Sequence, residues 1–154
     1  MESQKYTILV VEDDELTRNI VVKFLSKLGH LCITAIDGVD ALDKMKGNKF
    51  DAVITDVKMP KMDGIILTRE ISKQYPGLPI MVMTGFKEEY DAGTAIAGGA
   101  REFIIKPFTL SEFAIRLHKM INASEALRGR KSEKDKNKNI RDLMNELGEI
   151  LKKN

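Results

Sequence analysis

Short apolar runs recur along the first two thirds of the chain, and they are rich in valine and isoleucine. Runs of this length and composition are typical of strands that are buried on both faces of a sheet. The pattern therefore predicts five strands, at Tyr6–Val11, Leu31–Ala35, Ala52–Asp56, Ile80–Thr84 and Phe103–Ile105.

The segments between these runs carry apolar residues at helical spacing. In the first segment, Ile20, Phe24 and Leu28 fall on one face of a helix. The predicted helices are about Leu16–Leu28, Val39–Lys46, Ile65–Gln74, Glu88–Ala97 and Leu110–Asn122. Strands and helices that alternate in this way predict an α/β fold, with helices on both faces of a parallel sheet.

The character of the sequence changes after residue 125. Residues 126–139 are basic and hold few large apolar side chains, so we expect a solvated linker there. Residues 140–154 carry an apolar stripe at helical spacing, which predicts an amphipathic C-terminal helix. The stripe consists of Ile140, Leu143, Met144, Leu147, Ile150 and Leu151.

A helix this short is marginal in water on its own, so its stripe should pack on another surface. The candidates are the preceding domain, the same helix of a second subunit in a homodimer, or a partner protein. We expect intermolecular packing, because five strand–helix units need no further cover.

Composition narrows the class of protein. The chain has 154 residues, of which 43% are hydrophobic, enough for one domain with a sizeable core and an appendage. The single cysteine, Cys32, excludes a disulfide framework within one chain. The first residues form no apolar signal region, and no apolar run approaches the ~20 residues of a membrane span. We therefore expect a cytoplasmic protein.

Polar groups stand directly after four of the predicted strands. Glu12, Asp13 and Asp14 follow the first, Asp56 ends the third, Thr84 ends the fourth and Lys106 follows the fifth. The carboxyl ends of parallel strands share one edge of a sheet, which is the usual place for a ligand in such folds. Acids, a hydroxyl group and an ammonium group gathered there suit a divalent cation and a phosphoryl group.

These motifs, in this order, resemble the receiver domain of two-component response regulators, the CheY-like family. The most specific stretch is Asp56-Val57-Lys58-Met59-Pro60-Lys61-Met62-Asp63-Gly64. The resemblance covers about four fifths of the chain. It implies a receiver domain over residues 1–125, with a doubly wound five-stranded sheet in the order 2-1-3-4-5. The linker at 126–139 and the helix at 140–154 are additions to that domain.

The resemblance also implies a role for each site residue. Asp56 would be the phosphoacceptor, and Asp13, Asp56 and the backbone carbonyl of Lys58 would bind Mg²⁺. Glu12 would orient the ion through a bound water, while Thr84 and Lys106 would hold phosphoryl oxygens. Thr84 and Phe103 would act as the switch pair.

The function implied is that of a phosphoacceptor switch. A sensor histidine kinase or a histidine phosphotransfer protein would supply the phosphoryl group. The surface of the fourth helix, fifth strand and fifth helix would then change for an unknown downstream protein. Apart from its own phosphorylation and dephosphorylation, no enzymatic activity is expected, and neither is specific binding to nucleic acid.

Two alternatives use the same residue types. A Mg²⁺-dependent phosphatase of the haloacid dehalogenase type would need a second aspartate two residues after Asp56, where this chain has Lys58. A flavodoxin-like cofactor binder would want a hydroxyl-rich loop after the first strand, where this chain has acids.

Other polar residues have simpler interpretations. Asp63 is expected to cap the following helix. His30 is interpreted as a turn residue, and His118 as a helix-surface residue. Phe86, two residues after Thr84, is expected to shield an acyl phosphate from water.

Overall fold

A computed structural model describes residues 4–85, 92–127 and 133–152 of the chain. Within those ranges the strands form one parallel sheet in the order β2-β1-β3-β4-β5, which confirms the predicted fold class and strand order. The strands are β1 (Thr7–Val11), β2 (Leu31–Ala35), β3 (Ala52–Asp56), β4 (Ile80–Thr84) and β5 (Glu102–Ile105).

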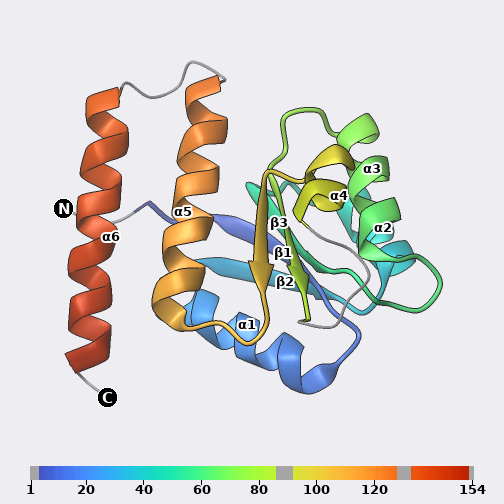
Figure 1. Ribbon diagram of the computed structural model, residues 1–154, viewed down its shortest axis with the longest axis horizontal. Helices are drawn as coiled ribbons and strands as arrows, with labels where there is room; N and C mark the ends of the chain where they lie inside the picture. The colour runs from blue at the N-terminus through green and yellow to red at the C-terminus, as the bar shows by residue number, and fades with distance from the viewer. Residues whose placement is uncertain (1–3, 86–91, 128–132, 153–154) are drawn as a thin grey trace.

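Helices cover both faces of this sheet (Figure 1). They are α1 (Glu15–Lys27), α2 (Gly38–Lys46), α3 (Gly64–Gln74), α4 (Ala92–Ala97), α5 (Leu110–Leu127) and α6 (Glu133–Lys152). The expected start of α4 at residue 88 lies outside the described residues. One apolar cluster joins β1 and β3 to α1, α5 and α6, and the other joins the sheet to α2, α3 and α4.

Aspartates fix where helices begin. The Asp14 carboxylate accepts hydrogen bonds from the backbone N–H and the hydroxyl group of Thr17, at 2.8 and 2.6 Å. Asp63 accepts from the backbone N–H groups of Ile65 and Ile66, both at 2.9 Å, which confirms its predicted capping role. These caps satisfy N–H groups that have no partner in the first turn of a helix.

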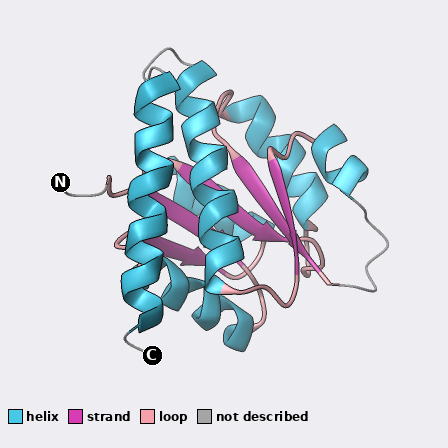
Figure 2. Ribbon diagram, turned by 60° about the vertical axis from the view of Figure 1, so that its left-hand side comes forward, coloured by secondary structure: helices cyan, strands magenta, loops and turns pink. Residues whose placement is uncertain are grey.

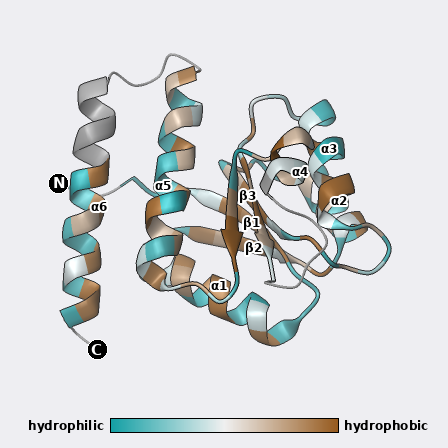
Figure 3. Ribbon diagram, viewed as in Figure 1, coloured by the Kyte–Doolittle hydropathy of each residue, from teal (hydrophilic) through white to brown (hydrophobic). Residues whose placement is uncertain are grey.

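The C-terminal helix packs on its own chain. Figure 2 shows α6 lying alongside α5, and Figure 3 shows hydrophobic and hydrophilic segments alternating along α6. Leu143 and Leu147 are each 2% exposed and belong to the same apolar cluster as residues of α5. The structure thus contradicts the expectation that this stripe packs mainly between molecules.

The helices are also longer than the sequence pattern indicated. Helix α5 continues to Leu127, and α6 begins at Glu133 rather than near residue 140. Residues 133–139 are therefore helical, although they were expected to be linker. The division of the chain into a receiver domain, a linker and a tail stays a prediction.

The two histidines are both buried, so the interpretation of His118 as a surface residue is wrong. Each residue is 6% exposed, and the Nε2 atoms of the two rings lie 3.0 Å apart. His30 Nδ1 accepts a hydrogen bond from the backbone N–H of Tyr6 at 3.2 Å. A neutral His30 must then carry its proton on Nε2 and donate it to His118, which carries its own proton on Nδ1.

In the part of the chain that the structure describes, no helix has the length and apolar character needed to cross a bilayer.

Candidate functional site

The loops that follow β1, β3 and β5 bring the candidate residues to one edge of the sheet. Backbone hydrogen bonds tie each loop to a neighbouring strand. The N–H of Glu12 donates to the carbonyl of Ala35 at 3.0 Å, and that of Lys106 donates to the carbonyl of Thr84 at 2.7 Å. This edge is the carboxyl end of the parallel strands, as the sequence predicted.

Three carboxylates meet at this edge. Oxygen atoms of Glu12, Asp13 and Asp56 lie within 4.8 Å of one another. Glu12 and Asp56 are 1% and 5% exposed, whereas Asp13 is exposed. Two buried acids beside an exposed one form a site that is open to solvent on one side.

Lys106 supplies a positive charge to this cluster. Its Nζ lies 2.9 Å from Asp56 Oδ1 and 3.4 Å from Glu12 Oε1. Burial alone lowers the pKa of the Lys106 ammonium group, but its contacts with Asp56 and Glu12 outweigh burial and raise it. The lysine is therefore firmly protonated beside the acids.

The charge on Glu12 is only partly compensated. Burial, with the adjacent Asp56 carboxylate adding to it, raises the pKa of Glu12 to about 8, although Lys106 acts in the opposite direction. Glu12 Oε2 is buried and accepts no hydrogen bond from the described residues. A site with more negative charge than its lysine can balance, and with free hard oxygen atoms, fits a cation such as Mg²⁺.

Thr84 is buried at the end of β4, and its hydroxyl group donates to the carbonyl of Gly85 at 3.4 Å. Lys58 is exposed in the loop that leaves β3. Phe103 is half-buried on β5, against the cluster that joins the sheet to α2, α3 and α4. The roles expected of these three residues stay predictions. Phe86 lies outside the described residues.

A glycine allows the close approach between the loop after β3 and the start of α3. A Cβ atom on Gly64 would lie 1.9 Å from the carbonyl oxygen of Asp56 and 3.0 Å from Cα of Val57. The N–H of Gly64 also donates to the carbonyl of Val57 at 2.7 Å. The backbone of Asp56 can lie this close to the start of α3 only because the residue at position 64 has no side chain.

Sequence reasoning missed Arg18. Its guanidinium Nη1 donates to the carbonyl of Glu12 at 2.9 Å and lies 3.5 Å from the carbonyl of Asp13. The sequence signal was weak, since it consisted only of one basic residue on the helix that follows the acids.

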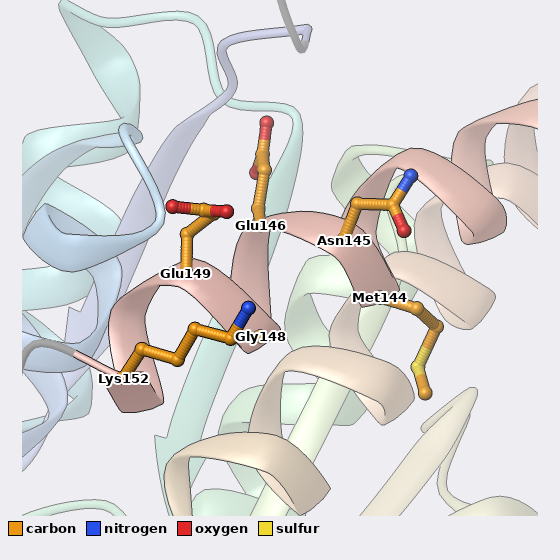
Figure 4. A pocket seen from close by; sticks show the side chains of 6 residues that line it. All are labelled: Met144, Asn145, Glu146, Gly148, Glu149 and Lys152. Atoms are coloured by element: carbon orange, nitrogen blue, oxygen red, sulfur yellow. The ribbon is translucent and has the colours of Figure 1, made fainter.

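Hollows elsewhere in the described structure hold none of these residues. One of about 410 Å³ lies along α6 and is lined by Met144, Asn145, Glu146, Gly148, Glu149 and Lys152 (Figure 4). Another, of about 240 Å³, lies near the ends of α2 and α3 and is lined mainly by apolar side chains, including Phe50 and Tyr75. Neither hollow gathers the carboxylates and the lysine found at the sheet edge.

Comparison with known proteins gives a consistent result. Residues 8–118 match the family model described as "Response regulator receiver domain". The response regulator MprA of Mycobacterium sp. (strain KMS) is 36% identical over 114 residues, which make up 74% of this chain and 50% of that protein. The chain spans about half the length of the curated relatives it matches.

Comparison with solved structures points to the same family. NtrX from Brucella abortus superposes with a TM-score of 0.78 and 32% identity, over 82% of this chain and 29% of NtrX. The receiver domain of the sensor histidine kinase PA1611 from Pseudomonas aeruginosa PAO1 gives a TM-score of 0.70 and 28% identity, over 77% of this chain and 98% of that one. Its description records a magnesium ion coordinated in the active-site cleft.

Proposed function

Because this chain belongs to the family of response regulator receiver domains, we propose that it is a phosphorylation switch in which Asp56 accepts the phosphoryl group. The observation that carries this proposal is the contact of Lys106 with Asp56 at 2.9 Å, inside a cluster of acids at the sheet edge. Asp56 is the acid that touches the ammonium group most closely, so a phosphoryl group on it would have a positive charge beside it.

In the proposed reaction, an oxygen of the Asp56 carboxylate attacks the phosphorus atom of a phosphohistidine on the donor protein. The P–N bond breaks, its electron pair stays on the donor imidazole, and the new P–O bond leaves an acyl phosphate on Asp56. Lys106 holds one phosphoryl oxygen, and the hydroxyl group of Thr84 donates a hydrogen bond to another.

Glu12, Asp13, Asp56 and the backbone carbonyl of Lys58 would hold Mg²⁺. When bound, the ion supplies positive charge to the phosphoryl oxygens. The acid cluster and the free oxygen of Glu12 support this assignment. The magnesium recorded in the PA1611 receiver domain supports it by analogy.

Phosphorylation would shift the population towards a state in which Thr84 contacts the phosphoryl group and the ring of Phe103 changes position. Arg116 ties α5 to the strand that carries Phe103, because its Nη1 donates to the carbonyl of Phe103 at 3.0 Å and to Glu102 Oε1 at 2.9 Å. The surface of α4, β5 and α5 would then bind a downstream protein.

The proposed setting is the cytoplasm, with a histidine kinase or a histidine phosphotransfer protein as donor. The phosphatase alternative finds no support in the comparisons, and Lys58 provides no carboxylate for a general acid.

Intact-mass spectrometry tests the proposal after incubation with Mg²⁺ and a small phosphodonor. We expect the wild type and Asp63→Asn to gain the mass of one phosphoryl group, because Asp63 only caps α3. Asp56→Asn should gain none, and chelation of Mg²⁺ should prevent labelling of all three proteins. Labelling of Asp56→Asn at the wild-type level would refute the assignment.

A further inference from the structure

Two consecutive carbonyl groups in the loop after β1 are contacted by a single side chain of α1. Arg18 Nη1 donates to the carbonyl of Glu12 at 2.9 Å and lies 3.5 Å from that of Asp13. The next carbonyl, that of Asp14, accepts the first backbone hydrogen bond of α1 at 2.9 Å, which does not depend on the side chain at position 18. Arg18 therefore fixes the peptide planes of the stretch that carries two of the three clustered acids.

The loop has few other constraints among the described residues. The N–H of Glu12 is tied to Ala35, and the side chain of Asp14 caps α1. Asp13 is exposed, and its carboxylate makes no hydrogen bond to the described residues, so its direction depends on the backbone beneath it. A half-buried guanidinium group bound to that backbone limits how far the two acids can separate.

We propose that Arg18 is a positioning residue for divalent-cation binding, acting through the backbone of Glu12 and Asp13. The inference rests on the proposed Mg²⁺ site and adds to it a residue that touches neither the ion nor the phosphoryl group. Groups that orient the ligands of a metal commonly change its affinity by ~10–100-fold when they are removed.

The charge of Arg18 and its backbone contacts should change the affinity for Mg²⁺ in opposite directions, so their effects can be told apart. Arg18 is positive, so its charge repels a cation at the nearby acids. Removing that charge should strengthen Mg²⁺ binding if the charge alone matters. Removing the backbone contacts should weaken it, because the acids are then free to move apart.

The test is a Mg²⁺ titration of the full chain, followed by amide chemical shifts, with no phosphodonor present. We expect Arg18→Ala to weaken Mg²⁺ binding by ~10-fold. Both carbonyl contacts of Arg18 come from the single atom Nη1, so the ammonium group of Arg18→Lys should keep part of them, and this variant should lose less Mg²⁺ affinity than Arg18→Ala. Arg69→Ala removes one positive charge from an exposed position on α3 and should leave binding unchanged.

Labelling of Asp56 by a small phosphodonor provides a second readout. At saturating Mg²⁺, Arg18→Ala should be labelled at the wild-type rate, since the residue does not touch the phosphoryl group. A slow rate that Mg²⁺ does not restore would overturn the proposal. Mg²⁺ binding by Arg18→Ala that is as tight as in the wild type, or tighter, would overturn it too.

Failure of this inference can be told apart from failure of the proposed function. If wild-type protein is labelled on Asp56 but the Arg18 variants bind Mg²⁺ normally, only the role of Arg18 is wrong. If wild-type protein is never labelled and Arg18→Ala still weakens Mg²⁺ binding, the positioning role stands and the phosphoacceptor function fails.

Discussion

Glu12 carries its carboxyl group buried beside Asp56, and its pKa of about 8 lies well above the ordinary 4.5. Between these two values the folded protein binds a proton at Glu12 that the unfolded chain does not. The free energy of unfolding of the metal-free protein therefore falls as pH rises from about 4.5 to about 8. Glutamine keeps the shape of the side chain without the charge.

Glu12→Gln should accordingly stabilise the metal-free protein by ~1–3 kcal/mol at pH 8 and by much less at pH 4.5. Urea unfolding with a chelator present, at the two pH values, measures the difference. An equal effect of the substitution at both pH values would show that the charge of Glu12 is not the cause.

Gly64 and Gly148 offer a matched pair of glycine-to-alanine substitutions. A Cβ at position 64 would collide with the backbone of Asp56, whereas one at position 148, within α6, would meet nothing within 4 Å. Gly64→Ala should destabilise the protein by ~1–3 kcal/mol and slow the labelling of Asp56.

Gly148→Ala should stabilise the protein by ~0.5–1 kcal/mol, because alanine favours a helix more than glycine does. Thermal unfolding and the rate of labelling measure both variants. Gly64→Ala that is labelled at the wild-type rate would mean that the loop after β3 tolerates the extra methyl group.

The sequence was most informative about the positions of residues that end a strand or directly follow one. Asp56, Thr84 and Lys106 could be placed at one edge because every parallel strand ends there. Arg18 could not be predicted, because its partners are backbone carbonyls and a sequence does not show where a carbonyl points. The burial of His118 was missed for a similar reason, since it packs against His30, 88 residues away in the sequence.

At the scale of elements, the packing of α6 on α5 predicts which residues of the stripe matter. Leu143 and Leu147 are buried, whereas Met144, between them in sequence, is 51% exposed. Leu143→Ala or Leu147→Ala should each lower the free energy of unfolding by ~2–3 kcal/mol through lost burial and the cavity left behind.

Met144→Ala is the control and should change the free energy of unfolding by less than ~0.5 kcal/mol. Amide hydrogen exchange provides a second measurement, in which α6 should lose protection in the leucine variants. If the leucine variants have the same free energy of unfolding as Met144→Ala, the packing of α6 against the rest of the chain does not stabilise the protein.

The ends of α5 and α6 show where hydrophobic patterning fails. Residues 133–139 contain no large apolar side chain, so they showed no helical period. Lysine and glutamate nevertheless have high helix propensity. The helix formed by the apolar stripe that follows can therefore continue back through these residues. Ala123, Ala126 and Leu127 likewise favour continuation of α5 beyond the predicted end at Asn122.

The His30–His118 contact joins the start of β2 to α5 and makes the fold sensitive to acid. Burial lowers the pKa of His30 to about 4, with Asp51 opposing this, against an ordinary value of 6.5. The unfolded chain then binds more protons at His30 between these values, so the contribution of His30 to stability is lost as pH falls from about 6.5 to about 4.

Imidazole resonances measure this directly, because the chain has two histidines in all. We expect His30 to remain neutral at pH 5.5 and to titrate near pH 4. Titration of His30 near 6.5 in the folded protein would contradict the buried, neutral pair.

At the scale of the whole molecule, the strand order places β1 beside β3 and β4 beside β5, so the ends of four separate strands contribute to one site. The register aligns the strand ends, with Val11 opposite Thr55 and Thr84 opposite Ile105. Acids from the first half of the chain thereby meet a lysine from the second half. Asp56, the proposed phosphoacceptor, lies at this meeting point.

Reductive trapping of the acyl phosphate tests the phosphoacceptor role of Asp56 most directly. After incubation with Mg²⁺ and a small phosphodonor, borohydride reduces a phosphorylated aspartate to homoserine, and peptide mass spectrometry locates the change. We expect homoserine at position 56 alone, with none in protein incubated without Mg²⁺. Homoserine at position 13 or 63, or a phosphoryl group that resists borohydride on another residue type, would contradict it.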